Sequence, residues 1–88
     1  MKIMVIGLGN FGTALAIKLT RLGNEVIGID RSRHKTESIK EFVTTVVTVD
    51  ITEASAVAQL PVEEMDVIVI SIGENLGDSV IATALLKD

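Results

Sequence analysis

The stretch Lys2-Ile-Met-Val-Ile-Gly-Leu-Gly-Asn-Phe-Gly12 decides the fold of this 88-residue chain. It opens with a short apolar run that stops at Gly7, which is typical of a buried parallel strand. The glycines that follow have the spacing GxGxxG and lead into a segment with helical periodicity. Because the motif lies between an expected strand and an expected helix, it indicates a phosphate-binding turn rather than an ordinary glycine-rich loop.

Each glycine of the turn has a separate mechanical role in that interpretation. Gly7 permits the tight change of direction after the strand, Gly9 leaves space for a pyrophosphate beside the backbone, and Gly12 lets the helix lie against the strand. The free N–H groups and the positive end of the helix dipole then bind phosphate oxygens. Asn10 and Phe11, which open the helix, complete this part of the candidate cofactor site.

The rest of the chain alternates apolar runs with helical stripes. Further strands are expected at residues 25–29, 46–49 and 66–72. A first helix is expected over residues 10–22, ended by a left-handed cap at Gly23, with an inward stripe of Phe11, Ala14, Leu15, Leu19 and Leu22. Later helices are expected to be a short one with Ile39, Phe42 and Val43 inward, a brief one capped by Thr52 before Pro61, and a last one that starts at Asn75 with Leu76, Val80, Ala84 and Leu85 inward.

This βαβαβαβα order predicts an α/β fold, a Rossmann-like parallel sheet with right-handed crossovers. We expect four strands in the order 3-2-1-4, with helices on both faces of the sheet. Doubly wound nucleotide-binding sheets commonly have about six strands. Residues 1–88 are therefore expected to form a single nucleotide-binding domain that is the front portion of a complete one.

Composition narrows the class of protein. Hydrophobic residues make up 48% of the chain, including 11 Ile and 11 Val, which excludes disorder and favours strands buried on both faces. The absence of cysteine excludes a disulfide scaffold and a cysteine-ligated metal site. No apolar run reaches the roughly 18–20 residues that cross a bilayer, and no basic leader precedes a cleavable apolar stretch. A cytosolic protein is therefore expected.

The net charge of −4 argues against nucleic acid as a partner, but the charge is unevenly distributed. Residues 1–44 carry seven Lys or Arg and four Asp or Glu, whereas residues 45–88 carry one and eight. The only basic cluster, Arg31, Arg33 and Lys35, has two interpretations. It is either the solvated start of a helix or a group in which some side chains face a bound anion.

Two aspartates end neighbouring strands, at the edge where parallel strands direct their ligands. Asp30 lies 18 residues after Gly12 and is predicted to bind an adenosine ribose, which favours NAD(H) or ADP/ATP over NADP(H). Arg31 beside it could hold a 2′-phosphate or stack on adenine. Asp50, followed by Ile51, is predicted to lie at the adenine edge. Each aspartate has the alternative role of capping the turn or helix that follows it.

The expected fourth strand delivers the remaining candidates to the other side of the crevice: Ser71, Ile72, Gly73 and Asn75. Gly73 is alternatively a turn residue, and Asn75 an N-cap. Catalytic groups are not recognisable, since His34 is a lone histidine in a polar segment and Ser71 has no neighbouring base. The sequence predicts binding without catalysis and without a metal.

Four ordered blocks give the chain a family resemblance that extends beyond the glycines. Lys2 to Asp88 resembles the N-terminal part of the KTN (TrkA-N, or RCK) domains that regulate potassium channels and transporters. The segment Ala82-Thr-Ala-Leu-Leu-Lys87 fits as well. The matching blocks are Val5-Ile-Gly-Leu-Gly-Asn-Phe-Gly12, Asn24-Glu-Val-Ile-Gly-Ile-Asp30, Val47-Thr-Val-Asp-Ile-Thr-Glu53 and Asp66-Val-Ile-Val-Ile-Ser-Ile-Gly-Glu-Asn75.

The resemblance implies a nucleotide-sensing regulatory domain rather than an enzyme. In this family the crevice binds NAD(H), ADP or ATP, and dimers assemble into rings beneath a potassium-conducting membrane protein. By position, the glycine turn would hold phosphate, Asp30 ribose and Asp50 adenine. Many transporter-regulating members have an arginine where this chain has Asn10, so a neutral Asn10 favours NAD(H) or ADP. The resemblance thus implies a homo-oligomer at the inner face of the cell membrane.

Two other functions stay open on the residues themselves. One is the cofactor-binding front of an NAD-dependent dehydrogenase or reductase, whose catalytic groups would come from a later segment. The other is a scaffold retained for oligomerisation, in which the nucleotide site is vestigial.

Overall fold

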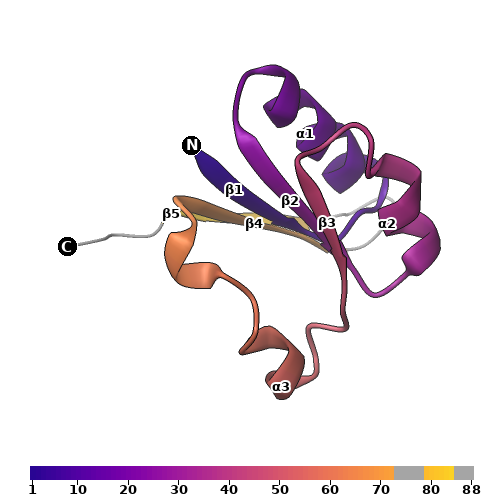
Figure 1. The fold of residues 1–88 in the computed structure, drawn as a ribbon, viewed down its shortest axis with the longest axis vertical. Helices are drawn as coiled ribbons and strands as arrows, with labels where there is room; N and C mark the ends of the chain where they lie inside the picture. The colour runs from indigo at the N-terminus through magenta and orange to yellow at the C-terminus, as the bar shows by residue number, and fades with distance from the viewer. Residues whose placement is uncertain (73–78, 85–88) are drawn as a thin grey trace.

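A five-stranded sheet forms the centre of the protein in the computed structural model, which describes residues 1–72 and 79–84 (Figure 1). The strand order is β3-β2-β1-β4-β5. The strands are β1 (Lys2–Ile6), β2 (Glu25–Asp30), β3 (Thr45–Thr48), β4 (Val67–Ile72) and β5 (Ser79–Ala84).

The first four strands are parallel, and β1 lies between β2 and β4. Ile3 pairs with Val26 of β2 on one side and with Val67 of β4 on the other. The expected order 3-2-1-4 is therefore confirmed. Because these four strands run in one direction, their carboxyl ends share one edge of the sheet, where ligands of α/β proteins bind.

The fifth strand corrects the sequence analysis, which expected residues from Asn75 onward to form a helix. Residues 79–84 instead form β5, antiparallel to β4, with Ser79 opposite Ile72 and Ala84 opposite Val67. Asn75 itself lies outside the described residues. Two physical reasons favour a strand: half of the segment is β-branched, and β4 would otherwise expose an unpaired edge.

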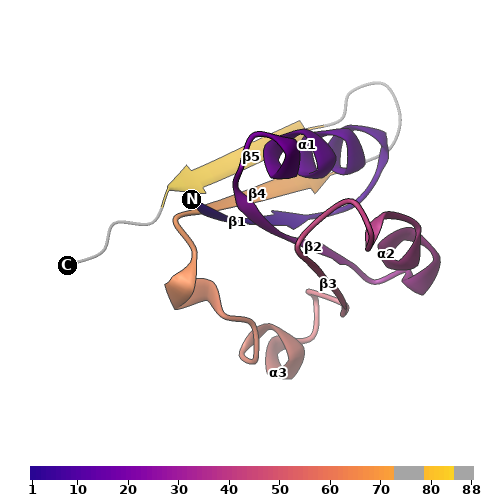
Figure 2. The ribbon, with the colours of Figure 1, turned by 45° about the horizontal axis from the view of Figure 1, so that its top comes forward.

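Two helices cover one face of the sheet, α1 (Asn10–Arg21) over β1, β2 and β4, and α2 (Arg33–Ile39) over β2 and β3 (Figure 2). The core between them and the sheet contains Val5 and Val26, both 0% exposed, and Ile39. Full burial of a side chain of this size contributes about 1.5–3 kcal/mol. The remaining buried members of this cluster are Ile3, Leu8, Ala16, Val43 and Val69.

The opposite face carries the segment between β3 and β4, which contains α3 (Ala54–Val57) and a 3₁₀ helix, η1 (Val62–Glu64) (Figure 2). Its core is a second cluster of Met4, Ile29 and Met65, against which Leu60 packs. Helical segments therefore lie on both faces, as expected, although η1 was not anticipated and α3 has only a single turn.

Four apolar residues expected to face the core are exposed. Phe11 is 48% and Leu22 65% exposed on α1, where Ala14 is exposed as well, and Phe42, which follows α2, is 52% exposed. The buried residues of α1 are Gly12 and Ala16. Gly12 has to be small because a Cβ there would collide with the Gly7 carbonyl oxygen, whereas Leu15 and Leu19 of the expected stripe pack, partly buried, against the core.

Smaller corrections concern the segment around β3. The strand begins and ends one residue earlier than expected, so that Val49 follows it. The N-cap of α3 is Glu53 rather than Thr52. Among the described residues, no helix has the length and apolar character needed to cross a membrane.

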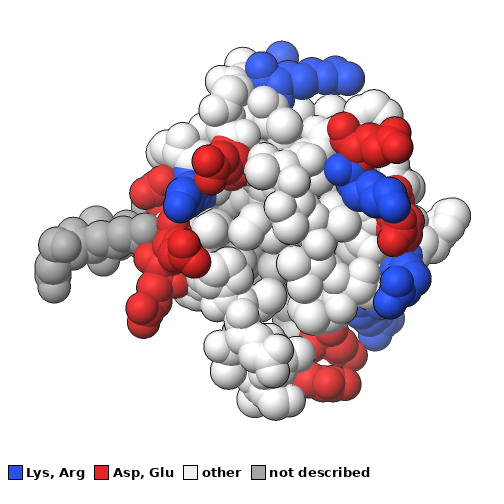
Figure 3. Space-filling model, viewed as in Figure 1, with Lys and Arg blue, Asp and Glu red and all other residues white. Residues whose placement is uncertain are grey.

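Charged side chains lie around the rim of the face that Figure 3 shows, and its centre is uncharged. Acidic and basic groups alternate along that rim. As far as its described residues go, this face has no continuous basic stripe of the kind that binds nucleic acid.

Candidate functional site

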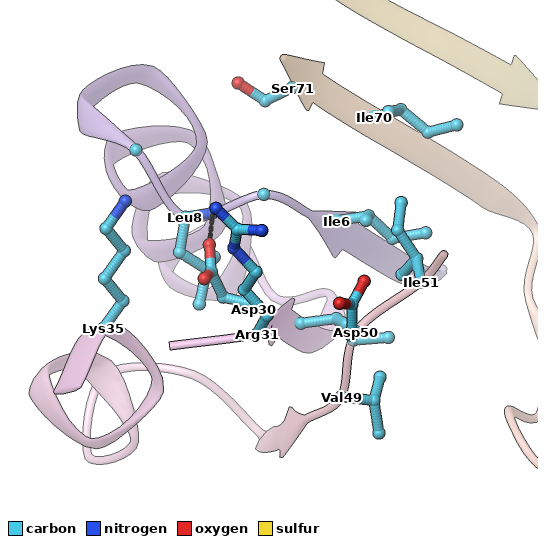
Figure 4. Close-up of a pocket in the computed structure, with 13 residues that line it drawn as sticks. Ile6, Leu8, Asp30, Arg31, Lys35, Val49, Asp50, Ile51, Ile70 and Ser71 are labelled. Atoms are coloured by element: carbon cyan, nitrogen blue, oxygen red, sulfur yellow. Dashed lines mark hydrogen bonds between the residues drawn. The ribbon is translucent and has the colours of Figure 1, made fainter. Parts of the chain in front are cut away.

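A cavity of about 340 Å³ opens at the carboxyl edge of the parallel strands (Figure 4). The ends of β1, β2 and β4 and the residues that follow β3 all contribute to it. Its lining residues are Ile6, Gly7, Leu8, Gly9, Ile29, Asp30, Arg31, Lys35, Val49, Asp50, Ile51, Ile70 and Ser71.

The glycine turn forms one wall of this cavity. Gly7 has φ +95°, a conformation that side-chain-bearing residues rarely adopt, and a Cβ there would collide with the Ser71 carbonyl oxygen. Its N–H donates to the Ile29 carbonyl at 2.8 Å, which ties the turn to β2. Gly12 packs directly behind Gly7. The turn is therefore held against both neighbouring strands by contacts that only glycine permits.

Helix α1 begins at this turn without a cap. Gly9 is its N-cap and makes no side-chain hydrogen bond, and the first turn contains no acidic residue. The first helical hydrogen bond runs from the Thr13 N–H to the Gly9 carbonyl, at 2.9 Å. The N–H groups of Asn10, Phe11 and Gly12 precede it, so they have no intrahelical acceptor. Within the described residues, the start of α1 thus presents N–H donors without an acceptor and the positive end of the helix dipole.

Asp30 joins the turn to the end of β2. One carboxylate oxygen accepts the Leu8 N–H at 2.8 Å (Figure 4). The other accepts the Ser32 N–H at 2.8 Å. The capping role considered from the sequence is therefore present. A carboxylate has about four acceptor sites. Two backbone bonds leave it able to accept hydroxyl groups from a molecule in the cavity.

Asp50 follows β3 on the opposite side of the cavity. Its Oδ1 accepts the Thr52 N–H at 2.9 Å and the Thr52 hydroxyl at 2.7 Å. These two bonds and the nearby positive charge of Arg31 lower the pKa of the Asp50 carboxyl. Asp50 is therefore a carboxylate at neutral pH, and it shapes the turn before α3.

Ser71, near the end of β4, has a buried hydroxyl that lacks a partner. The residue is 8% exposed, and its Oγ makes no hydrogen bond to any described residue. Such an atom is uncommon, since leaving a buried polar group unpaired costs about 1–3 kcal/mol. Ser71 lines the cavity, but its Oγ has almost no exposed surface, so the hydroxyl is enclosed beside the cavity.

The cavity brings together about half of the residues predicted from the sequence. Asn10, Phe11 and Gly12 lie in the first turn of α1 but do not line it, and Ile72 ends β4. Gly73 and Asn75 lie outside the described residues. The predicted residues that line the cavity are Gly7, Gly9, Asp30, Arg31, Asp50, Ile51 and Ser71.

Several lining residues were missed by the sequence analysis. Ile6, Ile29 and Ile70 could have been found, because each lies at or near the carboxyl end of a parallel strand. Lys35 was considered only as a member of the basic cluster; of that cluster Arg31 and Lys35 line the cavity, and Arg33 does not. The signal for Lys35 was its place three residues after Ser32, the N-cap of α2.

Groups for catalysis or metal binding are sparse in the described part of the chain. His34 is exposed on α2, as the sequence indicated, and does not line the cavity. No three His, Cys, Asp or Glu side chains within residues 1–72 and 79–84 are grouped to hold a metal ion. What the cavity offers is hydrogen-bond donors, two carboxylates, two cations and apolar walls.

Comparison with known proteins agrees with this architecture. The family model described as the TrkA-N domain matches residues 3–88. Ktr system potassium uptake protein A of Bacillus subtilis is 32% identical over 84 residues, and its namesake in Vibrio alginolyticus is 31% identical. Ktr system potassium uptake protein C of B. subtilis is 32% identical. Each alignment covers 96% of this chain and 38% of the relative, so the chain spans well under half of these proteins.

Proposed function

The chain belongs to the TrkA-N domain family, and on this premise we propose that it is a nucleotide-binding regulatory module of a potassium uptake system. The relatives named as Ktr potassium uptake proteins support the transport part of the proposal. The cavity beside the glycine turn supports the nucleotide part. None of these three relatives is named as an oxidoreductase, so their names give no support to the alternative function of an NAD-dependent dehydrogenase or reductase.

The observation that carries the proposal is the meeting of the start of α1 and the Asp30 carboxylate at one cavity. Gly9 lines the cavity at the start of α1, which has no side-chain cap, and Asp30 retains acceptor capacity beside its two backbone hydrogen bonds. A phosphate satisfies the first feature and a ribose the second. A phosphorylated nucleoside therefore matches the cavity better than a purely apolar or a cationic molecule would.

In this proposal the ligand is NAD(H), with ADP or ATP as related candidates. Its phosphates lie at Gly7, Gly9 and the first turn of α1, and its ribose lies at Asp30. The adenine lies over the apolar wall that includes Ile51, next to Asp50. A 2′-phosphate on the ribose would approach the Asp30 carboxylate, which disfavours NADP(H) by charge repulsion.

The second half of a dinucleotide would extend across the sheet toward the end of β4. Ser71 and Ile72 lie at this end, and Gly73 and Asn75 follow them in the sequence. ADP would leave this part of the crevice empty. The proposal therefore expects NAD(H) and ADP to share the α1 end of the site and to differ in what they contact beyond β1.

Regulation would follow from linkage. A ligand changes the activity of a partner only through its different affinity for two states of the complex. Each tenfold difference in affinity between the two states contributes about 1.4 kcal/mol per site. In a homodimer or a ring of several copies, the contributions of the individual sites would add. The partner in this proposal is a potassium-translocating membrane protein, with the module on its cytoplasmic side and no nucleic acid involved.

Calorimetric titration with NADH, NADPH, ADP and ATP tests the binding part. We expect saturable binding, tighter for NADH than for NADPH. Gly9→Val should abolish it while the circular dichroism spectrum stays unchanged, because a side chain there would occupy the phosphate position. Gly23→Ala, at the far end of α1, is the matched control and should bind normally. No heat with any nucleotide, or normal binding by Gly9→Val, would contradict the proposal.

A further inference from the structure

The glycine turn carries no charge of its own. Residues 7–13 read Gly-Leu-Gly-Asn-Phe-Gly-Thr, so the only positive field from the turn is that of the helix dipole. The cavity nevertheless contains two carboxylates, Asp30 and Asp50. An anionic ligand in this cavity would be repelled by both unless a cation compensates for them.

Two cations line the cavity, and they differ in what they do. Arg31 is exposed, and its charge acts on Asp50, on the β3 side of the cavity. Lys35 is half-buried on α2. In Figure 4 its side chain extends from α2 toward the start of α1, where the uncapped N–H groups lie. Lys35 therefore adds positive charge on the side of the cavity where the glycine turn lies.

The backbone that carries Lys35 is fixed on both sides. Its own N–H donates to the Ser32 hydroxyl at 3.3 Å, which caps α2. The next residue, Thr36, is 1% exposed, and its hydroxyl lies 2.7 Å from that of Thr48 on β3. Because α2 is anchored to the sheet here, the Lys35 side chain starts from a defined position, which reduces the entropy lost when it binds an anion.

Ser71 adds a polar residue to the lining of the same cavity from β4. Its Oγ is enclosed and has no partner in the described part of the chain, so the donors that the cavity offers come from other residues. Gly9 at the start of α1 and Lys35 both line this volume, and they bring backbone N–H and N⁺–H donors to its edge. Such a set of donors matches a group with several anionic oxygens, as phosphates have.

We propose that Lys35 is a phosphate-binding residue of this site and sets its preference for ligands with a diphosphate over the nucleoside alone. This inference rests on the proposed nucleotide function and goes beyond it by naming the residue that binds the charged part of the ligand. The ammonium binds phosphate oxygens on the side opposite the α1 N–H groups. It also offsets the charge of Asp30 and Asp50.

The test compares ADP with adenosine on the full chain and on Lys35→Met, by calorimetry at low and at physiological salt. We expect Lys35→Met to weaken ADP binding about 10- to 100-fold, the range for a hydrogen bond to a charged group, and to change adenosine binding by less than about twofold. Lys35→Arg should keep most of the ADP affinity. Lys40→Met is the matched control, since Lys40 follows the same helix, is exposed and lies outside the cavity.

The possible outcomes separate this inference from the function on which it rests. If the unmodified chain binds neither ADP nor NADH, the proposed function fails and the role of Lys35 fails with it. If the unmodified chain binds ADP and Lys35→Met binds it equally well, only the role of Lys35 is overturned. The role of Lys35 is also overturned if Lys35→Met weakens ADP and adenosine binding equally, because such a loss would not depend on the phosphates. It is overturned as well if Lys40→Met weakens ADP binding as much as Lys35→Met does, because Lys40 lies outside the cavity.

Discussion

The two ends of α1 are built in opposite ways. At the C-terminal end, the chain satisfies the last carbonyls itself: the Leu22 N–H donates to Lys18, that of Gly23 to Thr20 and that of Asn24 to Leu19. The Asn24 side chain adds a second donor to the Leu19 carbonyl, and the last turn is basic, with Lys18 and Arg21. At the N-terminal end there is neither a capping side chain nor an acidic residue.

The difference between the two ends of α1 indicates where another molecule can form hydrogen bonds with this small domain. Every helix has unsatisfied N–H groups at its start, and surface helices usually cover them with Ser, Thr, Asp or Asn. Helix α2 does so through Ser32. Helix α1 does not, and its open end is the one that faces the cavity. Helix α3 also lacks a side-chain cap, so it is the position of Gly9 in the cavity lining, and not the missing cap alone, that connects the start of α1 with the site. Four changes can break or sharpen the contrast between the two ends of α1.

The largest expected effect is that of Gly7→Ala at the open end. The substitution places a Cβ against the Ser71 carbonyl oxygen at a φ of +95°. The backbone at Gly7 cannot move without disturbing β1, and the backbone at Ser71 cannot move without disturbing β4. We therefore expect a loss of about 3 kcal/mol or more in the free energy of unfolding. Urea denaturation measures it. A loss below about 1 kcal/mol would show that the turn is not packed as described.

A smaller effect is expected from Asp30→Ala, which removes the side chain tied to Leu8 and Ser32. We expect NADH binding to weaken by about 1–3 kcal/mol, the scale of hydrogen bonds to a charged group. Asn24→Ala, at the closed end of α1, is the comparison: it should cost about 0.5–1.5 kcal/mol in unfolding free energy and leave NADH binding unchanged. Calorimetry and urea denaturation of both variants check this pair. An effect of Asp30→Ala on NADH binding below a few tenths of a kcal/mol would show that Asp30 does not contact the ligand.

Gly23→Ala is expected to cost less than Gly7→Ala although both glycines have nearly the same φ. Gly23 has φ +96°, and a Cβ there would meet no atom within 4 Å. Only the conformational penalty is left, about 1–2 kcal/mol. Thermal or urea denaturation of the two alanine variants side by side measures the difference. Equal losses would mean that φ alone, and not the contact with Ser71, makes glycine necessary at position 7.

The smallest effect concerns the charge of Asp50, which follows β3 and lines the cavity. Thr52 and Arg31 lower the pKa of Asp50, so the stability due to this carboxylate is present above its unfolded-state pKa and is lost as pH falls through the lower folded-state value. Thr52→Val removes the hydroxyl but keeps the backbone N–H. The Asp50 pKa should then rise toward its ordinary range in an NMR titration. An unchanged pKa would assign the shift to other groups.

Local pattern was sufficient for most of the fold and for part of the site. The alternation of strands and helices, the turn at Gly7 and the cap at Gly23 follow from residue types within a few positions of one another. The strand order 3-2-1-4 was predicted from the doubly wound topology that this alternation indicates. The burial pattern of α1 did not follow. Phe11 and Leu22 fit a helical stripe but are exposed, whereas Leu15 and Leu19 of the same stripe pack, partly buried, against the core. Periodicity indicates an apolar face but not how closely it approaches its neighbour.

The residues that line the cavity were likewise only partly predictable from local sequence pattern. Asp30 and Asp50 could be placed from their positions at or just after strand ends, whereas Lys35 could not, because its approach to the glycine turn depends on how α2 packs on β3 through Thr36. Whether Ser71 would find a hydrogen-bond partner was likewise invisible in the sequence, since any partner would have to come from another element. Residues that act across elements were the ones that sequence patterns missed.

The amino-acid sequence alone determined the alternation of strands and helices, the glycine turn and the acidic residues at the sheet edge. These depend on backbone sterics and on hydrophobic spacing, which act over a few residues. Only the tertiary structure decided that residues 79–84 pair as a strand with β4 and that Lys35 reaches the same cavity as Ser71. Each of these is a contact between segments distant in the chain, and its free energy depends on a neighbour that no local pattern contains.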